Sequence, residues 1–412
     1  MTSCDSKAST LIPMDEAIAR VLNASAERHR LRHEPVVELP LWDAHGHVLA
    51  SSVLADRDTP PFDRAAMDGF AFRAADTPGE PLRIIGEAPA GTVFPGTVGP
   101  GEAVSIMTGA PVPDGADTVA MIERCQVDGE LVQITGPTVL GRHIARQGED
   151  VRAGDVAVPA GRRIQGATVG VLAGVGATKV TVYRPPRVTV MATGDELVEH
   201  DAVPAPHQIR EGNRHTVMAM LRSLRAATVD GGLVKDTEEA IRDAVRAAAS
   251  SDIIVLSGGV SKGKYDLVQQ VLSDLGMETL FHGVRAKPGK PVLFGRLDDS
   301  LVLGLPGNPV STYVMGVLLL LPAVRAVAGL AHPHTRTLSA RLKGRLPATG
   351  ARTTYHPAVL DGAPGKIAEV TPVSWRGSGD LTGYAQSNCL IRAEVDSPPA
   401  EDGALVQVLL CG

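Results

Sequence analysis

From residue 187 to about residue 330, short apolar runs typical of strands alternate with segments whose apolar residues recur at helical spacing. Residues 253–256 are four consecutive apolar side chains, typical of a strand buried on both faces of a parallel sheet. Residues 188–191 form an earlier strand of this sheet. The segments with apolar residues on one helical face are 213–224, 236–250 and 267–275. The alternation predicts one doubly wound, three-layer α/β domain over 185–330.

The pattern differs on both sides of this domain. Residues 72–145 contain short β-rich runs between Gly and Pro turns, which predicts a small β domain. The sequence Arg-Pro-Pro at 184–186 marks the start of the α/β domain, and strand-like runs return beyond residue 331. That return predicts a C-terminal β domain. Near the start of the chain we expect a short amphipathic helix over 14–25.

Three glycine-rich stretches lie next to predicted strands of the α/β domain. Residues 257–266 follow the strand 253–256, residues 287–291 precede a short strand, and residues 304–311 follow another. In the last stretch, Asn308 has the position of a helix N-cap. Open α/β sheets bind ligands at the ends of their strands, so we expect the candidate site there.

Lysine is scarce in this chain, yet these stretches contain Lys262, Lys264, Lys287 and Lys290. Backbone N–H groups, a helix N-terminus and ammonium groups together bind anions, which favours a site for phosphate or another tetrahedral oxyanion. The alternative is that the lysines are solvated on ordinary loops. For any single lysine, a solvated position on a loop is the simpler interpretation. For four lysines beside three glycine turns, the anion site is favoured.

One of these stretches is close to a nucleotide-binding motif. Gly258, Gly263 and Lys264 have the spacing of a P-loop, but Tyr265 stands where that motif needs a Ser or Thr hydroxyl on Mg²⁺. The sequence therefore argues against a nucleoside triphosphatase of that class.

Several carboxylates are candidates for chemistry. Residues 195–196, Asp-Glu, follow the strand 188–191 and so lie at its carboxyl end. Asp68 interrupts a segment of small and apolar residues, although a turn aspartate is the simpler interpretation. Asp150 lies in a glycine turn that its side chain could satisfy. Asp236 and Glu239 predict a capping-box start for the following helix.

Charge and composition exclude some functions. The 412 residues include 40 Lys plus Arg and 46 Asp plus Glu, a net charge of −6, and 3% are aromatic, so nucleic acid is not expected as a partner. The four cysteines are far apart and form no Cys-x-x-Cys. They indicate neither a zinc site nor a disulfide framework, and favour a reducing cytoplasm.

Targeting signals and histidine metal sites are not expected either. Residues 1–10 lack the basic and apolar regions of a signal peptide. The longest apolar run, 314–324, contains Pro322 and is too short to span a bilayer, so we expect a buried helix and no membrane partner. The histidine pairs 45/47 and 332/334 are expected to be loop residues, because no third ligand has metal-site spacing.

An ordered set of motifs resembles one known family. The motifs lie at 66–71, 106–113 with 115–117, 148–151, 193–197, 257–261, 287–291 and 304–311. Together, over almost the whole chain, they resemble molybdopterin molybdotransferase, the MoeA family, to which the animal gephyrin E domain is related. Each motif alone is weak, but the ordered set is specific.

The resemblance implies an activity and a fold. Family members take adenylylated molybdopterin and molybdate, insert molybdenum with the help of a divalent cation, usually Mg²⁺, and release AMP. The implied fold has four domains: a discontinuous linking domain over 1–60 and 146–184, a small inserted β domain over 61–145, the molybdopterin-binding α/β domain over 185–330 and a β-barrel-like domain over 331–412. The implied assembly is a homodimer with sites between subunits, and other proteins of molybdenum-cofactor biosynthesis are further candidate partners.

The resemblance also assigns site residues. The candidate catalytic residues are Asp68, Thr108, Asp150, Glu196 and Asp266, of which Glu196 and Asp266 are the candidate metal ligands. The candidate substrate-binding residues are Thr193, Gly194, Ser257, Gly258, Gly259, Ser261, Lys287, Gly289, Lys290, Pro291, Pro306, Gly307, Asn308, Arg352 and Ser378.

The chain departs from the family pattern in a few places. Lys262 and Lys264 stand where the family often has an aliphatic residue and an acid, and Pro357 stands where it often has an arginine. Two lysines would weaken direct metal binding by this loop and strengthen anion attraction. Two other functions are open: a molybdopterin adenylyltransferase, although those relatives have a single domain, and a non-catalytic molybdopterin-binding scaffold.

Overall fold

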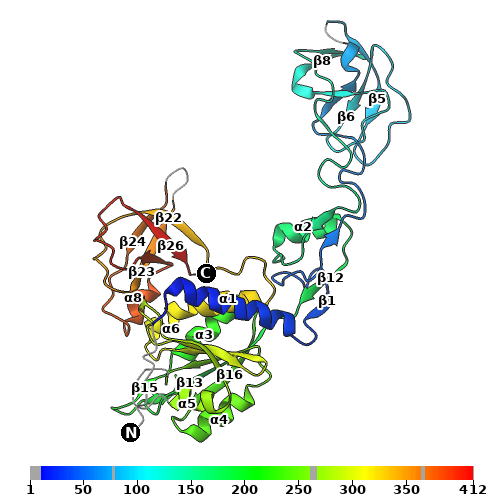
Figure 1. The fold of residues 1–412 in the computed structure, drawn as a ribbon. Coiled ribbons are helices and arrows are strands. Elements are labelled where there is room, and N and C mark those ends of the chain that lie inside the picture. Colours follow the sequence, from blue (N-terminus) through cyan, green and yellow to red (C-terminus); the bar gives the residue numbers. More distant parts are fainter. Residues whose placement is uncertain (1–10, 77–78, 260–266, 363–366, 412) are drawn as a thin grey trace, which may run out of the picture.

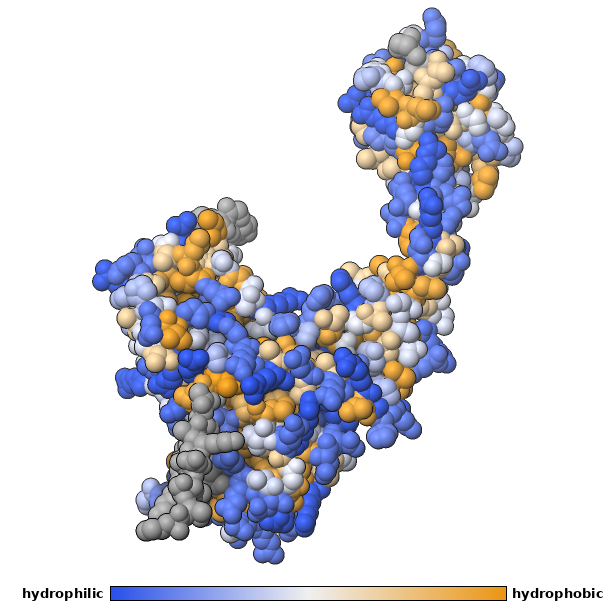
Figure 2. Space-filling view, in the orientation of Figure 1, coloured by the Kyte–Doolittle hydropathy of each residue, from blue (hydrophilic) through white to orange (hydrophobic). Residues whose placement is uncertain are grey.

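The computed structural model describes residues 11–76, 79–259, 267–362 and 367–411. The molecule is elongated: an α/β part and a β-barrel lie together at one end, and a small β unit stands at the far end of a narrow arm (Figure 1). The space-filling view shows open space between the small unit and the barrel on the face it displays (Figure 2). Helix α1 (Met14–Leu31) crosses the α/β part and runs toward the base of the arm (Figure 1).

The central sheet has six strands in the order β16-β13-β17-β21-β20-β18. In chain order they are β13 (Arg187–Thr193), β16 (Ala227–Val234), β17 (Ile253–Ser257), β18 (Glu278–His282), β20 (Leu293–Leu297) and β21 (Ser300–Leu305). The first four in the sheet are parallel, and β20 and β18 continue it antiparallel.

Helices cover both faces of this sheet. One face packs against α1, α3 (Asn213–Arg222), α6 (Pro309–Met315), a π-helical turn (Gly316–Leu320) and α7 (Leu321–Val327). The other face packs against α4 (Glu238–Ala247) and α5 (Leu267–Asp274). Strand β17 shows the alternation directly, because Ile253 and Val255 join the first core and Ile254 and Leu256 the second. The predicted doubly wound three-layer domain is confirmed.

The apolar run after Asn308 belongs to this core. The continuous helical segment Pro309–Val327 is long and apolar enough to cross a membrane, with a hydropathy of 1.8, but it is 89% buried inside the protein. Pro322, which has no N–H to donate, lies within this segment, two residues after the π-helical turn. The segment is therefore the buried helix that the sequence predicted.

The C-terminal strands close into a five-stranded barrel. They are β22 (Thr337–Leu342), β23 (Thr353–Asp361), β24 (Glu369–Pro372), β25 (Cys389–Ala393) and β26 (Leu405–Leu410). Closure follows because β23 pairs with both β24 and β25. The two-residue strand β19 (Ala286–Lys287) extends β23 in parallel, and Tyr355 with Tyr384 of α8 (Leu381–Ala385) packs into the α/β core. The barrel is thus fixed to the α/β part by shared packing.

The arm consists of antiparallel pairs formed by an outgoing and a returning segment. The pairs are β1 (Val36–Pro40) with β12 (Lys179–Tyr183), β2 (Val53–Leu54) with β11 (Val156–Val158) and β3 (Arg64–Ala65) with β10 (Ile144–Ala145). Helix α2 (Gly166–Gly174) packs beside them with its own small core.

The small β unit lies between the two halves of the arm in sequence. We use this name for strands β4 (Gly69–Phe72), β5 (Leu82–Ala88), β6 (Glu102–Ile106), β7 (Thr118–Met121), β8 (Cys125–Asp128) and β9 (Leu131–Ile134), with short 3₁₀ turns Ala74–Asp76 and Ile122–Arg124. They form one sheet in the order β7-β4-β6-β5-β9-β8, and its two faces carry separate apolar cores.

Two local predictions were wrong. The first helix extends to Leu31 rather than ending near residue 25, because its polar second half has partners in the α/β part: Arg28 and Arg32 pair with Asp252 at 3.0 and 3.2 Å. Helix α4 is capped by Thr237, whose hydroxyl accepts a hydrogen bond from the Ala240 N–H at 3.3 Å, so Asp236 is not its cap.

Candidate functional site

Four chain segments meet at the carboxyl edge of the central sheet. The register places Ala192 opposite Ser257 and Ser257 opposite Leu305, so β13, β17 and β21 end at the same edge. Strand β20 runs the opposite way, with Leu293 opposite Gly304, so the 287–291 stretch before it reaches that edge as well. The predicted glycine stretches therefore meet, as far as their described residues go.

The glycines after β17 are required by close packing. Gly258 has φ +99°, and a Cβ there would lie 2.3 Å from the carbonyl oxygen of Thr193. Gly259 has φ +64°, and a Cβ there would lie 2.5 Å from a methyl group of Val268 in α5. The next turn lies alongside but is less tight, because a Cβ on Gly307 would be in ordinary contact with the Gly258 Cα, at 3.7 Å. Larger residues would push these turns apart.

Asn213 ties two of the turns together. Its Nδ2 donates to the Ser257 Oγ at 2.9 Å and to the Gly307 carbonyl at 2.8 Å. Asn213 is the first residue of α3, so the helix start fixes the ends of β17 and β21. The sequence analysis placed it only at a helix start and missed this role, because nothing in the local pattern indicates a contact with residues 44 and 94 positions away.

A residue of the C-terminal region joins the same edge. The Asn308 Nδ2 donates to the Ser378 Oγ at 3.0 Å, and the Val310 N–H donates to the Ser378 carbonyl at 3.1 Å. Asn308 does occupy the N-cap position of α6, but its side chain makes no capping hydrogen bond and binds Ser378 instead. Pro306 is held by the Thr312 hydroxyl, which donates to its carbonyl.

The two described lysines of the site are exposed cations. Lys287 and Lys290 are both exposed, and the ion pairs among the described residues, mostly arginine pairs, do not include either ammonium group. Between them Gly289 has φ +103°, and a Cβ there would lie 2.7 Å from Met315, so the turn packs on α6. The Val284 N–H donates to the Lys290 carbonyl at 3.0 Å and fixes its backbone, and Pro291 leads into β20.

A hollow of about 530 Å³ opens beside Lys287, between the lysine stretch and the barrel. Its lining includes Arg345, Trp375 and Arg376, and also His356, which is 8% exposed. Burial, and then the charge of Lys287, lowers the pKa of His356 to about 4, so its imidazole is neutral at pH 7. The sequence analysis did not single out His356, because a strand histidine gives no signal of what lies opposite it.

A group of acids lies at the end of β13. The Asp236 N–H donates to the Asp195 Oδ1 at 3.2 Å, and Glu196 packs its carboxylate against Gly194. Burial raises the pKa of Asp236, and the charges of Asp195 and Glu196 raise it further, while the Thr193 hydroxyl opposes this. The predicted Glu196 thus belongs to a cluster of three acids.

Asp68 and Thr108 form a separate pair on the small β unit. The Thr108 N–H and hydroxyl both donate to the Asp68 Oδ1, at 2.6 and 2.8 Å. These bonds, the backbone one first, hold the pKa of Asp68 below its usual range, so it is an exposed carboxylate with Oδ2 free of hydrogen bonds from the described residues. Within one chain the small β unit that carries this pair stands at the far end of the arm from the central sheet (Figure 1).

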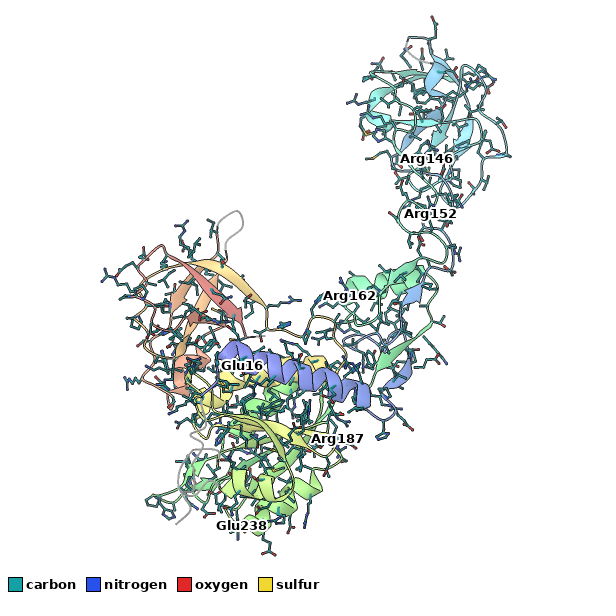
Figure 3. All side chains as sticks on the ribbon, viewed as in Figure 1. Glu16, Arg146, Arg152, Arg162, Arg187 and Glu238 are labelled. Carbon is teal, nitrogen blue, oxygen red and sulfur yellow. The ribbon has the colours of Figure 1, made fainter. Side chains whose placement is uncertain are left out.

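The remaining candidates are scattered or outside the described residues. Asp150 is exposed on the arm, where its N–H donates to the Thr59 carbonyl at 3.0 Å; the flanking Arg146 and Arg152 are labelled in Figure 3. Arg352 immediately precedes β23, and its side chain is not part of the hollow's lining. The candidates Ser261 and Asp266, with the neighbouring Lys262 and Lys264, lie outside the described residues.

Comparison with known proteins covers almost the whole chain. Models of the MoeA N-terminal region (domain I and II), of a probable molybdopterin binding domain and of the MoeA C-terminal region (domain IV) match residues 12–176, 189–326 and 339–411. A Nostoc protein named molybdopterin molybdenumtransferase is 34% identical, over 85% of this chain and 83% of its own length. The Bacillus subtilis protein of the same name is 33% identical, over 97% and 94%.

A solved structure agrees over the same extent. The molybdopterin biosynthesis MoeA protein of Pyrococcus horikoshii superposes with a TM-score of 0.79 at 28% identity, covering 97% of this chain and 100% of the other. Fold and site thus define a multidomain protein whose doubly wound α/β sheet presents a cationic, glycine-lined edge to a β-barrel. The chain belongs to the MoeA family.

Proposed function

We propose that this chain inserts molybdenum from molybdate into adenylylated molybdopterin and releases AMP, a step of molybdenum-cofactor biosynthesis. The observation that carries the proposal is the meeting of glycine turns and the unpaired Lys287 and Lys290 at one sheet edge. The names of the full-length relatives support the identity of the substrates. We expect the protein to act in the cytoplasm.

The site would work mainly by holding anions. Molybdate and a phosphoanhydride repel each other, so their reaction requires cations and N–H donors that bring both into place. Lys287 and Lys290 would hold molybdate, assisted by Gly289, Pro291 and residues that resemblance assigns to the same role, namely Ser261, Arg352 and Ser378. The turns formed by Thr193, Gly194, Ser257, Gly258, Gly259, Pro306, Gly307 and Asn308 would receive the adenylylated pterin.

Mg²⁺ is part of the proposal. Mg²⁺ prefers oxygen ligands, and the neighbouring carboxylates of Asp195, Glu196 and Asp236 offer only oxygen donors. The raised pKa of Asp236 supports this fit, because a nearby cation would offset both the burial of the carboxylate and the repulsion from Asp195 and Glu196 that raise it. When bound, the ion would neutralise charge on the phosphate leaving group. Asp266 is kept as a further candidate ligand from the resemblance alone.

Glu196→Gln tests this assignment. The substitution keeps the shape and removes the charge, so we expect AMP release to require more Mg²⁺ while binding of adenylylated molybdopterin stays close to wild type. An unchanged Mg²⁺ titration would make Glu196 a structural residue at the end of β13.

We propose a homodimer in which Asp68 and Thr108 of one subunit face the lysine stretch of the other. The pair stands on an arm away from its own sheet edge (Figure 1). Next to it, Met67 and Met107 are 43% and 44% exposed, which suits a surface covered by a partner. An isologous dimer would complete two such sites, with Asp150 nearby on the arm. The low pKa of Asp68 favours contact with a cation over proton transfer.

Mixed dimers test the shared site. Asp68→Ala and Lys290→Ala proteins, each expected to be impaired alone, are mixed under conditions of proven subunit exchange. Random exchange makes about half of the dimers mixed, each with one intact site, so we expect roughly a quarter of wild-type activity per total protein. A monomer in solution, or no recovery, would contradict the shared site.

The activity itself is tested by AMP release. Purified protein is incubated with adenylylated molybdopterin and Mg²⁺, with and without molybdate, and AMP is quantified. We expect release only with molybdate. Pyrophosphate release from ATP and molybdopterin would instead indicate an adenylyltransferase, and tight pterin binding without turnover would indicate a scaffold.

A further inference from the structure

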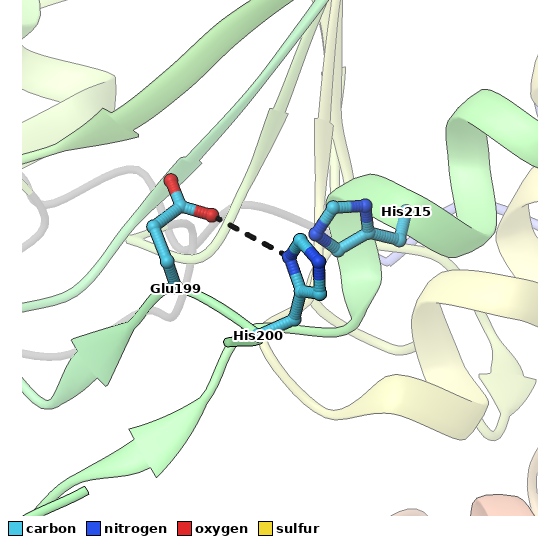
Figure 4. Close-up of side chains that lie close together, drawn as sticks. All are labelled: Glu199, His200 and His215. Carbon is cyan, nitrogen blue, oxygen red and sulfur yellow. Dashed lines mark ion pairs between the residues drawn. The ribbon is translucent and has the colours of Figure 1, made fainter. Parts of the chain in front are cut away.

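A cluster of two histidines and a glutamate lies beside the sheet edge and has no part in the proposed reaction. Glu199 and His200 directly follow β14 (Leu197–Val198), and His215 lies in the first turn of α3. One ligand atom from each side chain lies within 4.8 Å of the other two. The imidazole of His215 meets that of His200 edge to face, and the Glu199 carboxylate points toward His200 (Figure 4).

The polar atoms of this cluster are incompletely satisfied. The Nε2 of His215 is buried and has no hydrogen-bond partner among the described residues. The Oε2 of Glu199 approaches the Nδ1 of His200 at 4.0 Å, which is longer than a hydrogen bond. The buried Nε2 of His215 thus lies unbonded beside a partly exposed carboxylate and an exposed imidazole, whereas buried polar atoms are usually hydrogen-bonded.

The surrounding charge favours a cation. Three carboxylates, of Glu199, Glu211 and Asp230, converge on the single guanidinium of Arg214, so negative charge is in excess. Arg214 also orients Glu199 through a 2.6 Å bond to Oε2, the same oxygen that lies 4.0 Å from the His200 Nδ1. The other nearby guanidinium is that of Arg210, whose Nε donates to the Ala202 carbonyl of the same loop.

We propose that Glu199, His200 and His215 form a site for a divalent transition metal, with Zn²⁺ as the expected ion. Imidazole nitrogens select such metals over Mg²⁺, and two histidines with one carboxylate are a ligand set used for zinc. Ligand atoms around tetrahedral zinc lie roughly 3.3–3.5 Å apart, so small side-chain rotations would close the observed spacing. A fourth position would be left for water.

The site would join two elements that border the proposed active site. The loop that carries Glu199 begins three residues after Glu196, and α3 carries Asn213, which holds the turns at Ser257 and Gly307. A bound metal would therefore fix the end of β13 against the start of α3. The proposal goes beyond the transferase function, and its test measures metal binding without any assay of activity.

Equilibrium dialysis with Zn²⁺ tests the site. Metal-free protein without a histidine tag is dialysed against Zn²⁺ in excess Mg²⁺, and zinc per chain is measured. We expect one tight equivalent. Losing even an outer partner of a metal ligand weakens affinity about 10–100-fold, so His200→Ala and His215→Asn should each weaken binding by at least about tenfold. His200 is exposed, so its substitution should leave the fold unchanged.

Two controls separate this site from others. His207→Ala removes an exposed histidine of the same loop and should retain the zinc equivalent. Glu196→Gln alters the acid cluster at the sheet edge and should also retain it. Co²⁺ in place of Zn²⁺ should give the visible absorption of a four-coordinate site in wild type and in His207→Ala, but not in His200→Ala. Equal zinc binding by wild type, His200→Ala and His215→Asn, or no tight equivalent at all, would overturn the proposal.

Discussion

The carboxyl edge of the central sheet and the Thr108 turn of the small β unit both place acids beside glycine turns, but in opposite electrostatic settings. At the edge, burial and the charges of Asp195 and Glu196 raise the pKa of Asp236. On the small unit, two hydrogen bonds from Thr108 hold the pKa of Asp68 below its usual range. Negative charge is thus costly at the edge without a cation, whereas Asp68 is a stable, exposed anion. The first region needs a counter-charge, and the second can bring a carboxylate to a partner.

The two regions also differ in how much space surrounds their glycines, and this difference gives the largest predicted effect. A Cβ on Gly258 would lie 2.3 Å from the Thr193 carbonyl, whereas a Cβ on Gly109 would have no atom within 4 Å, although both residues have positive φ. Gly258→Ala should cost about 3 kcal/mol or more, from strain plus steric overlap. Gly109→Ala should cost about 1–2 kcal/mol, from strain alone. Denaturant unfolding of both variants checks this, and equal losses would mean that the edge can relax.

The second effect concerns pH. Because the folded-state pKa of His356 is about 4 and the usual value is 6.5, the unfolded chain binds a proton that the folded chain does not. Stability should therefore fall as the pH falls from about 7 to about 4, by up to about 3 kcal/mol from this group. His356→Gln should show a shallower decline in urea unfolding over that range. Parallel curves for the two proteins would contradict the assignment to His356.

The third effect separates a site lysine from an ordinary one. Lys290→Ala removes an unpaired cation at the edge. It should lower kcat/KM for molybdate by the equivalent of about 1–3 kcal/mol and leave the fold intact. Lys343 is exposed on the barrel and provides the matched control. Lys343→Ala should change molybdate dependence little. An equal loss in both variants would mean that the effect comes only from the change in the protein's net charge.

The smallest effect tests the counter-charge directly. Asp236→Asn should stabilise the Mg²⁺-free protein at pH 7, by on the order of 1 kcal/mol or less, because it removes a partly buried charge beside two others. The same variant should gain less stability from added Mg²⁺ than wild type. For comparison, Asp68→Asn should not stabilise the protein, because the Asp68 charge is favourable where it stands. Thermal unfolding of wild type and both variants, with and without Mg²⁺, measures these changes in stability.

The sequence predicted those features whose signals are local. The uninterrupted strand 253–256 and the glycines after it required only periodicity and backbone sterics, and both were found at the sheet edge. Predictions from local polarity were less accurate. Asp236 was assigned as a helix cap, but it joins the acid cluster, because capping by Thr237 one residue later satisfies the helix equally well.

Contacts across long sequence separations could not be predicted. The sequence placed Asp68 in a segment of small and apolar residues without showing what they pack against, and in the structure Phe70 and Phe72 are buried in their own sheet at 4% and 0% exposure. Only neighbours such as Met67 remain exposed. Asn213 and His356 gave no signal, because their roles depend on which segments the fold places opposite them. The histidine cluster was missed for the same reason, since the fold brings His215 of α3 beside Glu199 and His200 of the preceding loop.

The paired strands of the arm make the small β unit an insertion with adjacent ends. Ala65 lies opposite Ile144 and Arg64 opposite Ala145, so the chain leaves and returns at one point. The unit could therefore be excised and replaced by a two-residue hairpin turn, leaving the rest of the protein to fold. The same pairing also sets the length of the arm. The reach of the arm can change only when both strands gain or lose residues together, in steps of about 3.3 Å per residue pair.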